Sequence, residues 1–460
     1  MLKAKSILVC FISAITVLLA CGCNPPKAAI RQFNEYYTTG QYDQALTFSE
    51  SKISKNKTGK GEDVLWCLNA GTIYRLKHQP AESNRLFDYA EEMINKHEAD
   101  RNKAGETFGS ALINDNVVAY TGKTYDGIMT NVYKALNFMQ MGNNDLARVE
   151  FNRALDRQRR AIEYYNKEVQ KLQQEVDKKN SDNKKNNAQE IDNSKYNDVI
   201  SRNYPDLDRY EVYNDFVNPF ANYLAGLFFY LEGDYSKSID LLKESAGMNS
   251  NNEFIVADFK MVEGVALENK SASNHVWVIY ENGLSPERTD FTFGLPIPIS
   301  GEMIFVEIAL PKLESRSLAS ANLTLASGAV QVKSKTIASM ERVIQTEFKK
   351  EFSLILTKAI IGATTKAVIQ YSLRDQDPLI RLAALAHTLI TTTADVRMWT
   401  SLPKEFQVAR IDMPADRRVQ ITVPGKEIKT IELPECKNVI IYVKLPVVSG
   451  VPVYDIMPFN

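Results

Sequence analysis

Apolar residues recur at helical spacing through the first half of the chain, from Lys27 to about Phe259. Their period of three to four residues predicts α-helices with one buried face. A short motif of small and aromatic residues around a glycine recurs along this half, which favours repeated helical hairpins. Its four copies lie within Phe33–Leu46, Leu68–Ala90, Ala135–Ala154 and Ala225–Ser245.

The spacing of these small residues resembles that of tetratricopeptide repeats. In that pattern, small residues on one helix let the next pack closely, and a glycine turns the corner between them. The fourth copy matches best, with Gly226 on its first helix, Gly233 at the turn and Ser238 on its second helix. We expect a tetratricopeptide-like helical domain over residues 27–268; a generic helical bundle with glycine-containing turns is the alternative.

Polar stretches interrupt the repeats. Residues 101–127 predict a loop-rich insertion, and an apolar stripe over Leu155–Val176 predicts one long protruding helix. The low-complexity run at about residues 178–199 predicts a disordered arm or a solvated hairpin tip. Basic residues on the long helix alternate with acidic ones, so a salt-bridged face is expected there rather than a nucleic-acid patch. These basic residues are Arg157, Arg159 and Arg160.

After about Asn269 the pattern changes to alternation with a period of two, which predicts β-strands. Between them, a long apolar helical pattern and a shorter one predict a helical hairpin inserted at about residues 337–393. Lys358 and Lys366 within the long pattern favour a packed helix over a membrane span. The expected strands are 276–280, 291–299, 303–310, a hairpin within 321–332 that turns at Ser327-Gly328, and 406–411, 419–423, 428–433 and 439–445.

The two halves together predict an α+β multidomain fold. A tetratricopeptide-like helical-hairpin solenoid is followed by a β-sandwich-like domain over residues 269–460, with the helical hairpin inserted in it.

The N-terminus carries a processing signal. Lys3 and Lys5 precede an apolar run that is too short to span a membrane, which indicates a signal peptide over residues 1–20. Leu18-Leu19-Ala20-Cys21 resembles the lipobox of bacterial lipoproteins, which implies diacylation, for example with palmitate, at Cys21; Cys23 offers an alternative frame. Residues 21–26 would form the lipid tether. We expect an envelope protein that faces the periplasm, anchored in the outer membrane rather than the inner one.

Composition narrows the function classes. The 460 residues have 44% hydrophobic and 24% charged residues, as in soluble globular proteins, and a formal charge of −1. Removal of Lys3 and Lys5 with the signal peptide would make this charge −3. A chain so near neutrality argues against nucleic acid as a partner. The five cysteines do not form a disulfide framework, and the four histidines show no metal-ligand spacing, so neither a cofactor nor a metal is expected.

Three motifs in the C-terminal half resemble a family of uncharacterised bacterial lipoproteins with a tetratricopeptide-like N-terminal half. They are Tyr280-Glu281-x-Gly283-x-x-Pro286, Ala394-Asp395-x-Arg397-x-Trp399-x-x-Leu402-Pro403, and Gln407-Val-Ala-Arg410. The resemblance implies a role in the cell envelope or in peptidoglycan assembly, and no catalytic residue. The candidate binding residues within these motifs are Tyr280, Glu281, Asp395, Arg397, Trp399 and Arg410.

Two functions follow as expectations. In the first, the lipid-anchored protein is a scaffold whose helical groove holds envelope proteins, with the peptidoglycan-synthesis machinery as one candidate, and it is not an enzyme. In the second, the protein binds or modifies a glycan or peptidoglycan, with Glu281 or Asp395 as acid or base and Trp399 as a platform. The alternative for these residues is that they hold together the helix-to-strand junction. A facing pair of carboxylates without an arginine to neutralise them would favour the enzyme.

Overall fold

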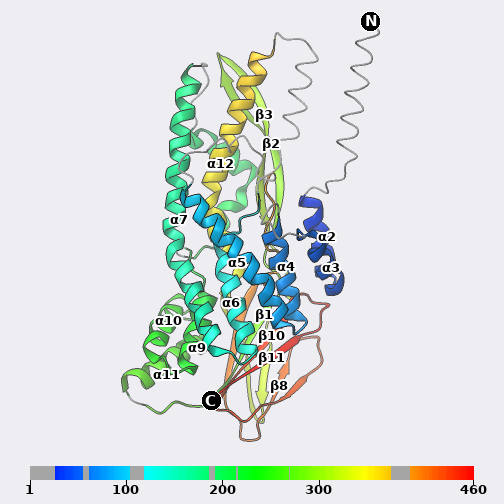
Figure 1. Cartoon of the computed structure of the whole chain (residues 1–460), viewed down its shortest axis with the longest axis vertical. Helices are drawn as coiled ribbons and strands as arrows, with labels where there is room; N and C mark the ends of the chain where they lie inside the picture. The colour runs from blue at the N-terminus through cyan, green and yellow to red at the C-terminus, as the bar shows by residue number, and fades with distance from the viewer. Residues whose placement is uncertain are drawn as a thin grey trace.

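The chain has an α+β fold, as the sequence predicts, with helices first and strands after them (Figure 1). The computed structural model describes residues 26–54, 62–103, 119–185, 192–213, 216–268, 270–374 and 394–460. The predicted signal peptide and both candidate lipid-attachment residues, Cys21 and Cys23, lie outside these ranges. So does the second helix of the expected inserted hairpin.

The helical half is built from antiparallel pairs, because short turns join consecutive helices. Short helical segments, η3 (Asn193–Tyr196), α8 (Asn197–Asn203) and η4 (Pro205–Arg209), lead from the third pair to the fourth. The pairs are α2 (Pro26–Thr38) with α3 (Tyr42–Lys52), α4 (Asp63–Leu76) with α5 (Pro80–Lys103), α6 (Thr124–Gln140) with α7 (Asn144–Lys185), and α9 (Pro219–Leu231) with α10 (Tyr235–Met248), followed by α11 (Glu253–Glu268).

The second and fourth helix pairs each contain the same kind of close-packed crossing between their two helices. Ser83 Oγ donates to the carbonyl of Gly71, and Ser238 Oγ donates to the carbonyl of Gly226, at equivalent places. A Cβ atom at Gly71 would lie 2.6 Å from the Phe87 ring, so only glycine permits this approach. The helical hairpins are therefore confirmed, and their membership of the tetratricopeptide class stays a prediction.

The expected polar arm at about 178–199 is helical in its described parts, so disorder is wrong for those residues, and the hairpin-tip alternative stays a prediction. Helix α7 continues to Lys185, and η3 and α8 begin at Asn193. The stripe on α7 explains the continuation, because Leu172 is buried and Tyr165 donates to the carbonyl of Lys350 on a neighbouring helix. Packing thus extends the helix into a sequence whose composition suggests disorder.

The C-terminal half contains three sheets. A five-stranded sheet has the order β11-β10-β1-β7-β6, a four-stranded sheet the order β5-β4-β8-β9, and β2 pairs only with β3. The strands are β1 (His275–Asn282), β2 (Glu287–Ile299), β3 (Glu302–Glu314), β4 (Thr324–Ser327), β5 (Val330–Lys333), β6 (Lys335–Ser339), β7 (Glu405–Asp412), β8 (Arg418–Thr422), β9 (Lys429–Glu432), β10 (Asn438–Leu445) and β11 (Val453–Phe459).

The two larger sheets enclose a core between them, as a sandwich does. Val278 and Tyr280 of β1 face this core together with Val419 and Ile421 of β8. The alternate residue Trp277 belongs to the opposite core, on the helical side. The strands are not a simple meander, because β1 lies between β7 and β10 and pairs with β10 in parallel. Neither this pairing nor β11 is predicted from the sequence.

The inserted helical segment differs from the prediction at its start. Residues 335–339 form β6 and pair with β7, so helix α12 (Met340–Ser372) begins at Met340 rather than at Ile337. Helix α12 is the one described helix that is long and apolar enough to cross a membrane, and 44% of its most apolar window is buried. It packs against α6, α7, β2 and β3. Together α7, α12 and the β2–β3 hairpin form a stalk that rises from the body (Figure 1).

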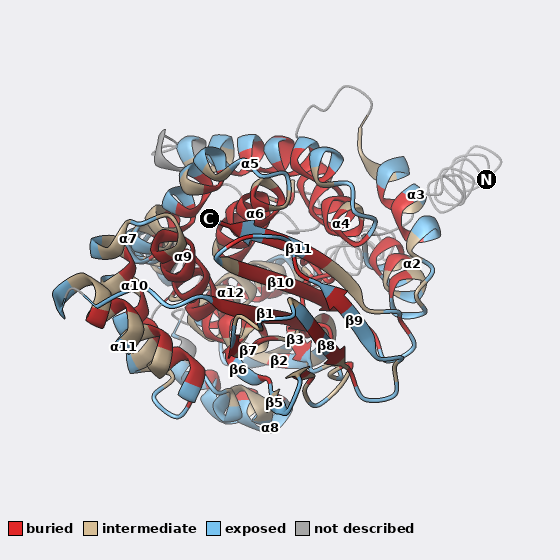
Figure 2. Ribbon diagram, turned by 90° about the horizontal axis from the view of Figure 1, so that it is seen from below, coloured by how far each residue is buried: buried red, intermediate tan, exposed pale blue. Residues whose placement is uncertain are grey.

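The helices curve around the five-stranded sheet in an arc (Figure 2). One continuous core joins Phe33 and Leu65 in the helices to Trp277 and Tyr442 in the sheet. The change from helix to strand does fall near residue 269, since α11 ends at Glu268 and β1 begins at His275. The core nevertheless crosses this boundary, and the concave side of the helical layer is filled by the protein's own sheet.

Candidate functional site

The six candidate residues are buried or half-buried and lie at four places. Glu281 is 6% exposed and points from β1 into the helical layer. It accepts hydrogen bonds from the Tyr442 hydroxyl at 2.8 Å and the Tyr133 hydroxyl at 3.0 Å, and it pairs with Arg75 Nη1 at 3.3 Å. The Arg75 guanidinium also lies 3.9 Å from the centre of the Tyr133 ring. Burial alone would lower the pKa of Arg75, but the Glu281 carboxylate raises it above its ordinary value.

Trp399 lies beside the Glu281 cluster, inside the protein. Its side chain is fully buried, and its ring centre is 5.7 Å from that of Tyr133. Its Nε1 donates to Thr72 Oγ1 and to Ser401 Oγ, each at 3.0 Å. A ring that is packed on both sides and whose N–H is bonded to α4 cannot serve as a platform for a sugar.

Asp395 and Arg397 form an ion pair with each other at a second place. Asp395 Oδ1 accepts from Arg397 Nε at 2.8 Å, and Oδ2 accepts from Nη2 at 3.0 Å. Burial would raise the pKa of Asp395, but the hydrogen-bonded Arg397 holds it below its ordinary value. Residues 394–399 belong to no sheet, so the pair lies in a segment before β7.

Arg410 and Tyr280 occupy two further places. Arg410 pairs with the buried Asp258 of α11, which also accepts from Tyr223 Oη at 2.7 Å and Trp277 Nε1 at 3.1 Å. Tyr280 points into the sandwich core, where its hydroxyl meets Ser320 Oγ at 2.8 Å.

Glu281 and Asp395 therefore do not form a facing acid–base pair. Each is bound by a different arginine, Arg75 or Arg397, which offsets its charge. The arrangement agrees with the alternative reading of these residues, in which they join the helical layer to the sheet. Within the described residues, no group of three His, Cys, Asp or Glu side chains is placed to hold a metal ion.

Two buried charge clusters were missed by the sequence reasoning. Lys444 of β10 donates to Asp455 Oδ2 at 2.5 Å and to the carbonyl of Arg75 at 2.8 Å. Burial lowers the pKa of Lys444 to about 8. The signal for this pair is a lysine and an aspartate among residues that are otherwise largely apolar, but the partner of Lys444 on α4, Arg75, is more than 360 residues away in sequence.

The second cluster joins α12 to the start of α6. Glu347 accepts from the backbone N–H groups of Thr124 at 2.7 Å and Tyr125 at 3.1 Å, which have no partner within the helix. Glu351 accepts from Lys123 Nζ at 2.8 Å. Burial raises the pKa of Glu347 to about 8, and the neighbouring Glu351 carboxylate adds to this rise.

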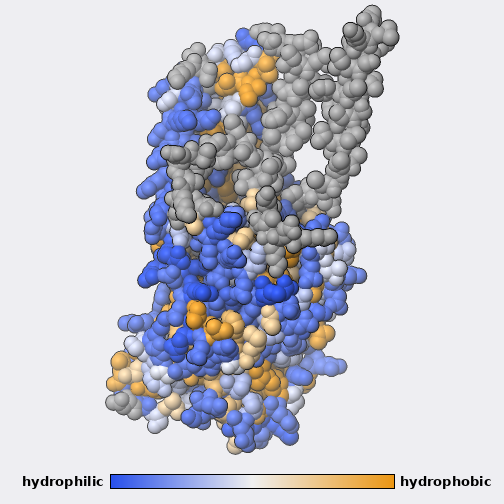
Figure 3. Space-filling view, viewed as in Figure 1, coloured by the Kyte–Doolittle hydropathy of each residue, from blue (hydrophilic) through white to orange (hydrophobic). Residues whose placement is uncertain are grey.

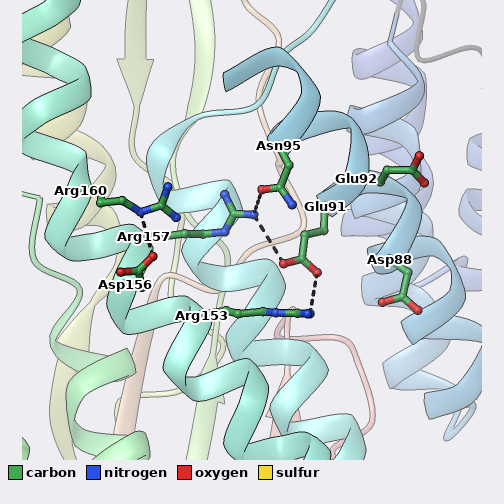
Figure 4. Close-up of a pocket in the computed structure, with 8 residues that line it drawn as sticks. All are labelled: Asp88, Glu91, Glu92, Asn95, Arg153, Asp156, Arg157 and Arg160. Atoms are coloured by element: carbon green, nitrogen blue, oxygen red, sulfur yellow. Dashed lines mark hydrogen bonds and ion pairs between the residues drawn. The ribbon is translucent and has the colours of Figure 1, made fainter. Parts of the chain in front are cut away.

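The outer surface of the helical layer has an open hollow of about 410 Å³ between α5 and α7 (Figure 4). Acidic residues of α5 and arginines of α7 line it, and Glu91 and Arg157 lie close together at its floor, with Arg157 Nη2 3.5 Å from Glu91 Oε1. The predicted salt-bridged face is confirmed, because Arg159 and Arg160 both pair with Asp156, at 2.5 and 2.8 Å. The exposed Glu92 stands at the rim.

Comparison of the chain with protein-family models gives no match. Comparison with curated proteins gives none either.

Proposed function

We propose that the protein is a lipid-anchored envelope lipoprotein that faces the periplasm, in the outer membrane, and acts as a scaffold for other envelope proteins. The lipobox at Leu18–Cys21 supports the anchor, and the near-neutral charge supports partners other than nucleic acid. Proteins of the peptidoglycan-synthesis machinery are the partners that the family resemblance favours.

One observation favours the outer surface of the helical layer over its concave side as the binding surface. The five-stranded sheet fills the concave side of the helical layer, where Tyr133 and Arg75 already bind Glu281 and Tyr442 (Figure 2). A partner would therefore bind the outer surface rather than the groove that the sequence suggested. The hollow between α5 and α7 is the strongest candidate, since it carries both charge signs and so suits a protein surface of mixed charge.

The anchor is tested by metabolic labelling with palmitate. We expect Cys21→Ala to abolish labelling and to release the chain from the membrane fraction, and Cys23→Ala to leave both unchanged. Labelling that is lost only with Cys23→Ala would move the attachment site to Cys23, and labelling unaffected by either change would contradict a lipoprotein.

The partner is tested by site-specific photocrosslinking in intact envelopes. A benzoylphenylalanine in place of Glu92, at the rim of the hollow, should give a discrete adduct with an envelope protein. The matched control is the same group in place of Val330, which is 54% exposed on β5. The scaffold proposal fails for this surface if Glu92 gives no adduct, or the same adduct as Val330.

A further inference from the structure

The end of the stalk exposes an apolar surface that the fold does not use. Met303 is 56% exposed and Phe305 is 69% exposed, both on β3, and Ile369 of α12 is 48% exposed. Figure 3 shows hydrophobic residues gathered at this end of the molecule. Large apolar side chains that are exposed together indicate an interaction surface rather than chance.

The register of the hairpin defines this surface. Pro296 pairs with Phe305 and Pro298 pairs with Met303, so these four side chains share one face of the two-stranded sheet. We name this face the tip patch. The alternate residues Leu295 and Ile297 are buried on the opposite face, against which α12 packs. The packing of this opposite face against α12 therefore stabilises the hairpin without a contribution from the tip patch.

The prolines argue against one kind of partner. Pro296 and Pro298 have no N–H group, so this edge of β2 cannot extend the sheet with a strand from another protein. The charges near the tip have neighbours of opposite sign. Arg374 Nη1 pairs with Glu302 Oε1 at 3.0 Å. The exposed Glu307, which follows Phe305 on the same face of β3, lies near Lys366 of α12. An exposed apolar face at the end of the stalk suits the interfacial region of a lipid bilayer.

The length of the tether places such a bilayer within reach. Lys27 of α2 pairs with Asp290 of β2, and Asn34 Nδ2 donates to Glu287 Oε2 at 2.8 Å, so α2 lies against the base of the hairpin. The six residues from Cys21 to Lys27 span at most about 21 Å. The nine residues from Asp290 to Ile299 rise about 30 Å along the strand. Because the tether is shorter than this rise, a membrane that holds the lipid also meets the end of the stalk when the stalk leans by at least about 45° from the membrane normal.

We propose that the tip patch enters the interface of the same bilayer that holds the lipidated cysteine. The inference rests on the lipid anchor of the proposed function and adds a second point of contact. Two contacts fix the orientation of the body, whereas a lipid on a short tether leaves it free to rotate. Each contact also strengthens the other, because the anchored stalk meets the bilayer at high effective concentration.

The test uses tryptophan fluorescence, since the native Trp66, Trp277 and Trp399 are buried. The acylated protein with Phe305→Trp is reconstituted into vesicles of phosphatidylethanolamine and phosphatidylglycerol with brominated acyl chains. Val330→Trp is the matched control, because Val330 is similarly exposed, near the β4–β5 turn. We expect bromine to quench the added emission of Phe305→Trp by about twofold and to leave that of Val330→Trp unchanged.

Equal emission from Phe305→Trp in brominated and ordinary vesicles would overturn the proposal, and so would equal quenching of both variants. The same measurement on a Cys21→Ala chain at high lipid concentration separates the tip from the anchor. Quenching of Phe305→Trp there supports the tip patch even if Cys21 proves not to be acylated. Absence of palmitate labelling in the chain with Cys21 intact, with quenching of Phe305→Trp retained, would refute only the anchor.

Discussion

At the scale of single residues, the candidate site is a junction held by buried charges. The Arg75–Glu281 pair and its two tyrosines connect α4 and α6 to β1 and β10. A buried pair of this kind contributes little net stability compared with apolar packing, but the loss of one partner leaves an uncompensated charge in a dry site.

Glu281→Gln should therefore destabilise the protein although it preserves shape. The neutral amide leaves the buried Arg75 without its counter-charge, and we expect the free energy of unfolding to fall by about 3 kcal/mol. Urea denaturation of the mature Cys21→Ala chain measures this. The exposed Glu427→Gln is the control and should change the value by less than about 0.5 kcal/mol. Similar values for the two variants would mean that the pair does not hold the junction.

The raised pKa of the buried Glu347 predicts that the stability of the fold falls as the pH rises. Its pKa is raised from 4.5 to about 8 in the folded state, so the folded chain holds a proton that the unfolded chain releases. This contribution to stability is complete below the unfolded pKa of 4.5 and is lost as the pH rises to about 8. Asp126, whose pKa burial raises to about 6, acts in the same direction.

Glu347→Gln isolates the contribution of Glu347, because the amide cannot ionise. Denaturation midpoints across this pH window should fall less with rising pH in the variant than in the parent chain. Parallel slopes would show that Glu347 does not titrate within the window.

At the scale of elements, the sequence predicts where each helix and strand lies better than it predicts which elements pack or pair with one another. The continuous apolar run Val276–Tyr280 is local and correctly predicts β1, whereas its parallel partner β10 lies about 160 residues away and leaves no local signal of the pairing. The motif residues show the same limit. Tyr280 and Glu281 are adjacent, so they point to opposite faces of β1, and the sequence does not tell which face meets the helices.

The crossing of α9 and α10 depends on a glycine. A Cβ atom at Gly226 would lie 2.9 Å from Leu242, inside contact distance, so Gly226→Ala should lower stability by about 1–3 kcal/mol. Gly247 in α10 has open space around it, and Gly247→Ala should raise stability by up to about 1 kcal/mol through helix propensity. Thermal unfolding of the two variants gives opposite signs if the crossing is as close as described.

At the scale of the whole molecule, the two halves share one core. Phe228 of α9 packs 6.5 Å, ring to ring, from Phe459 of the last strand, and Phe220 stacks on Phe406 of β7 at 3.5 Å. The change in composition near residue 269 coincides with the change from helices to strands, and buried residues of both halves belong to one core. A shared core cannot be predicted from periodicity, which shows that a face is buried but not what covers it.

Residues 27–268 alone should consequently fail to form a compact monomer. Without the sheet, the concave face exposes Tyr133, Phe220 and Phe228, which are fully buried in the whole chain. Size-exclusion chromatography and binding of a hydrophobic dye measure this, with residues 27–460 as the control. A monomeric fragment that binds no dye would show that the helical half is an independent domain.

The order of the strands also determines when folding can finish. The central strand β1 needs β10 on one side, and β10 in turn pairs with β11 on its other side. The helical half is translated first but acquires its inner surface from β10 and β11, which are made much later. Its core therefore cannot close until these strands have been made, and its aromatic helical faces stay open to chaperones until then.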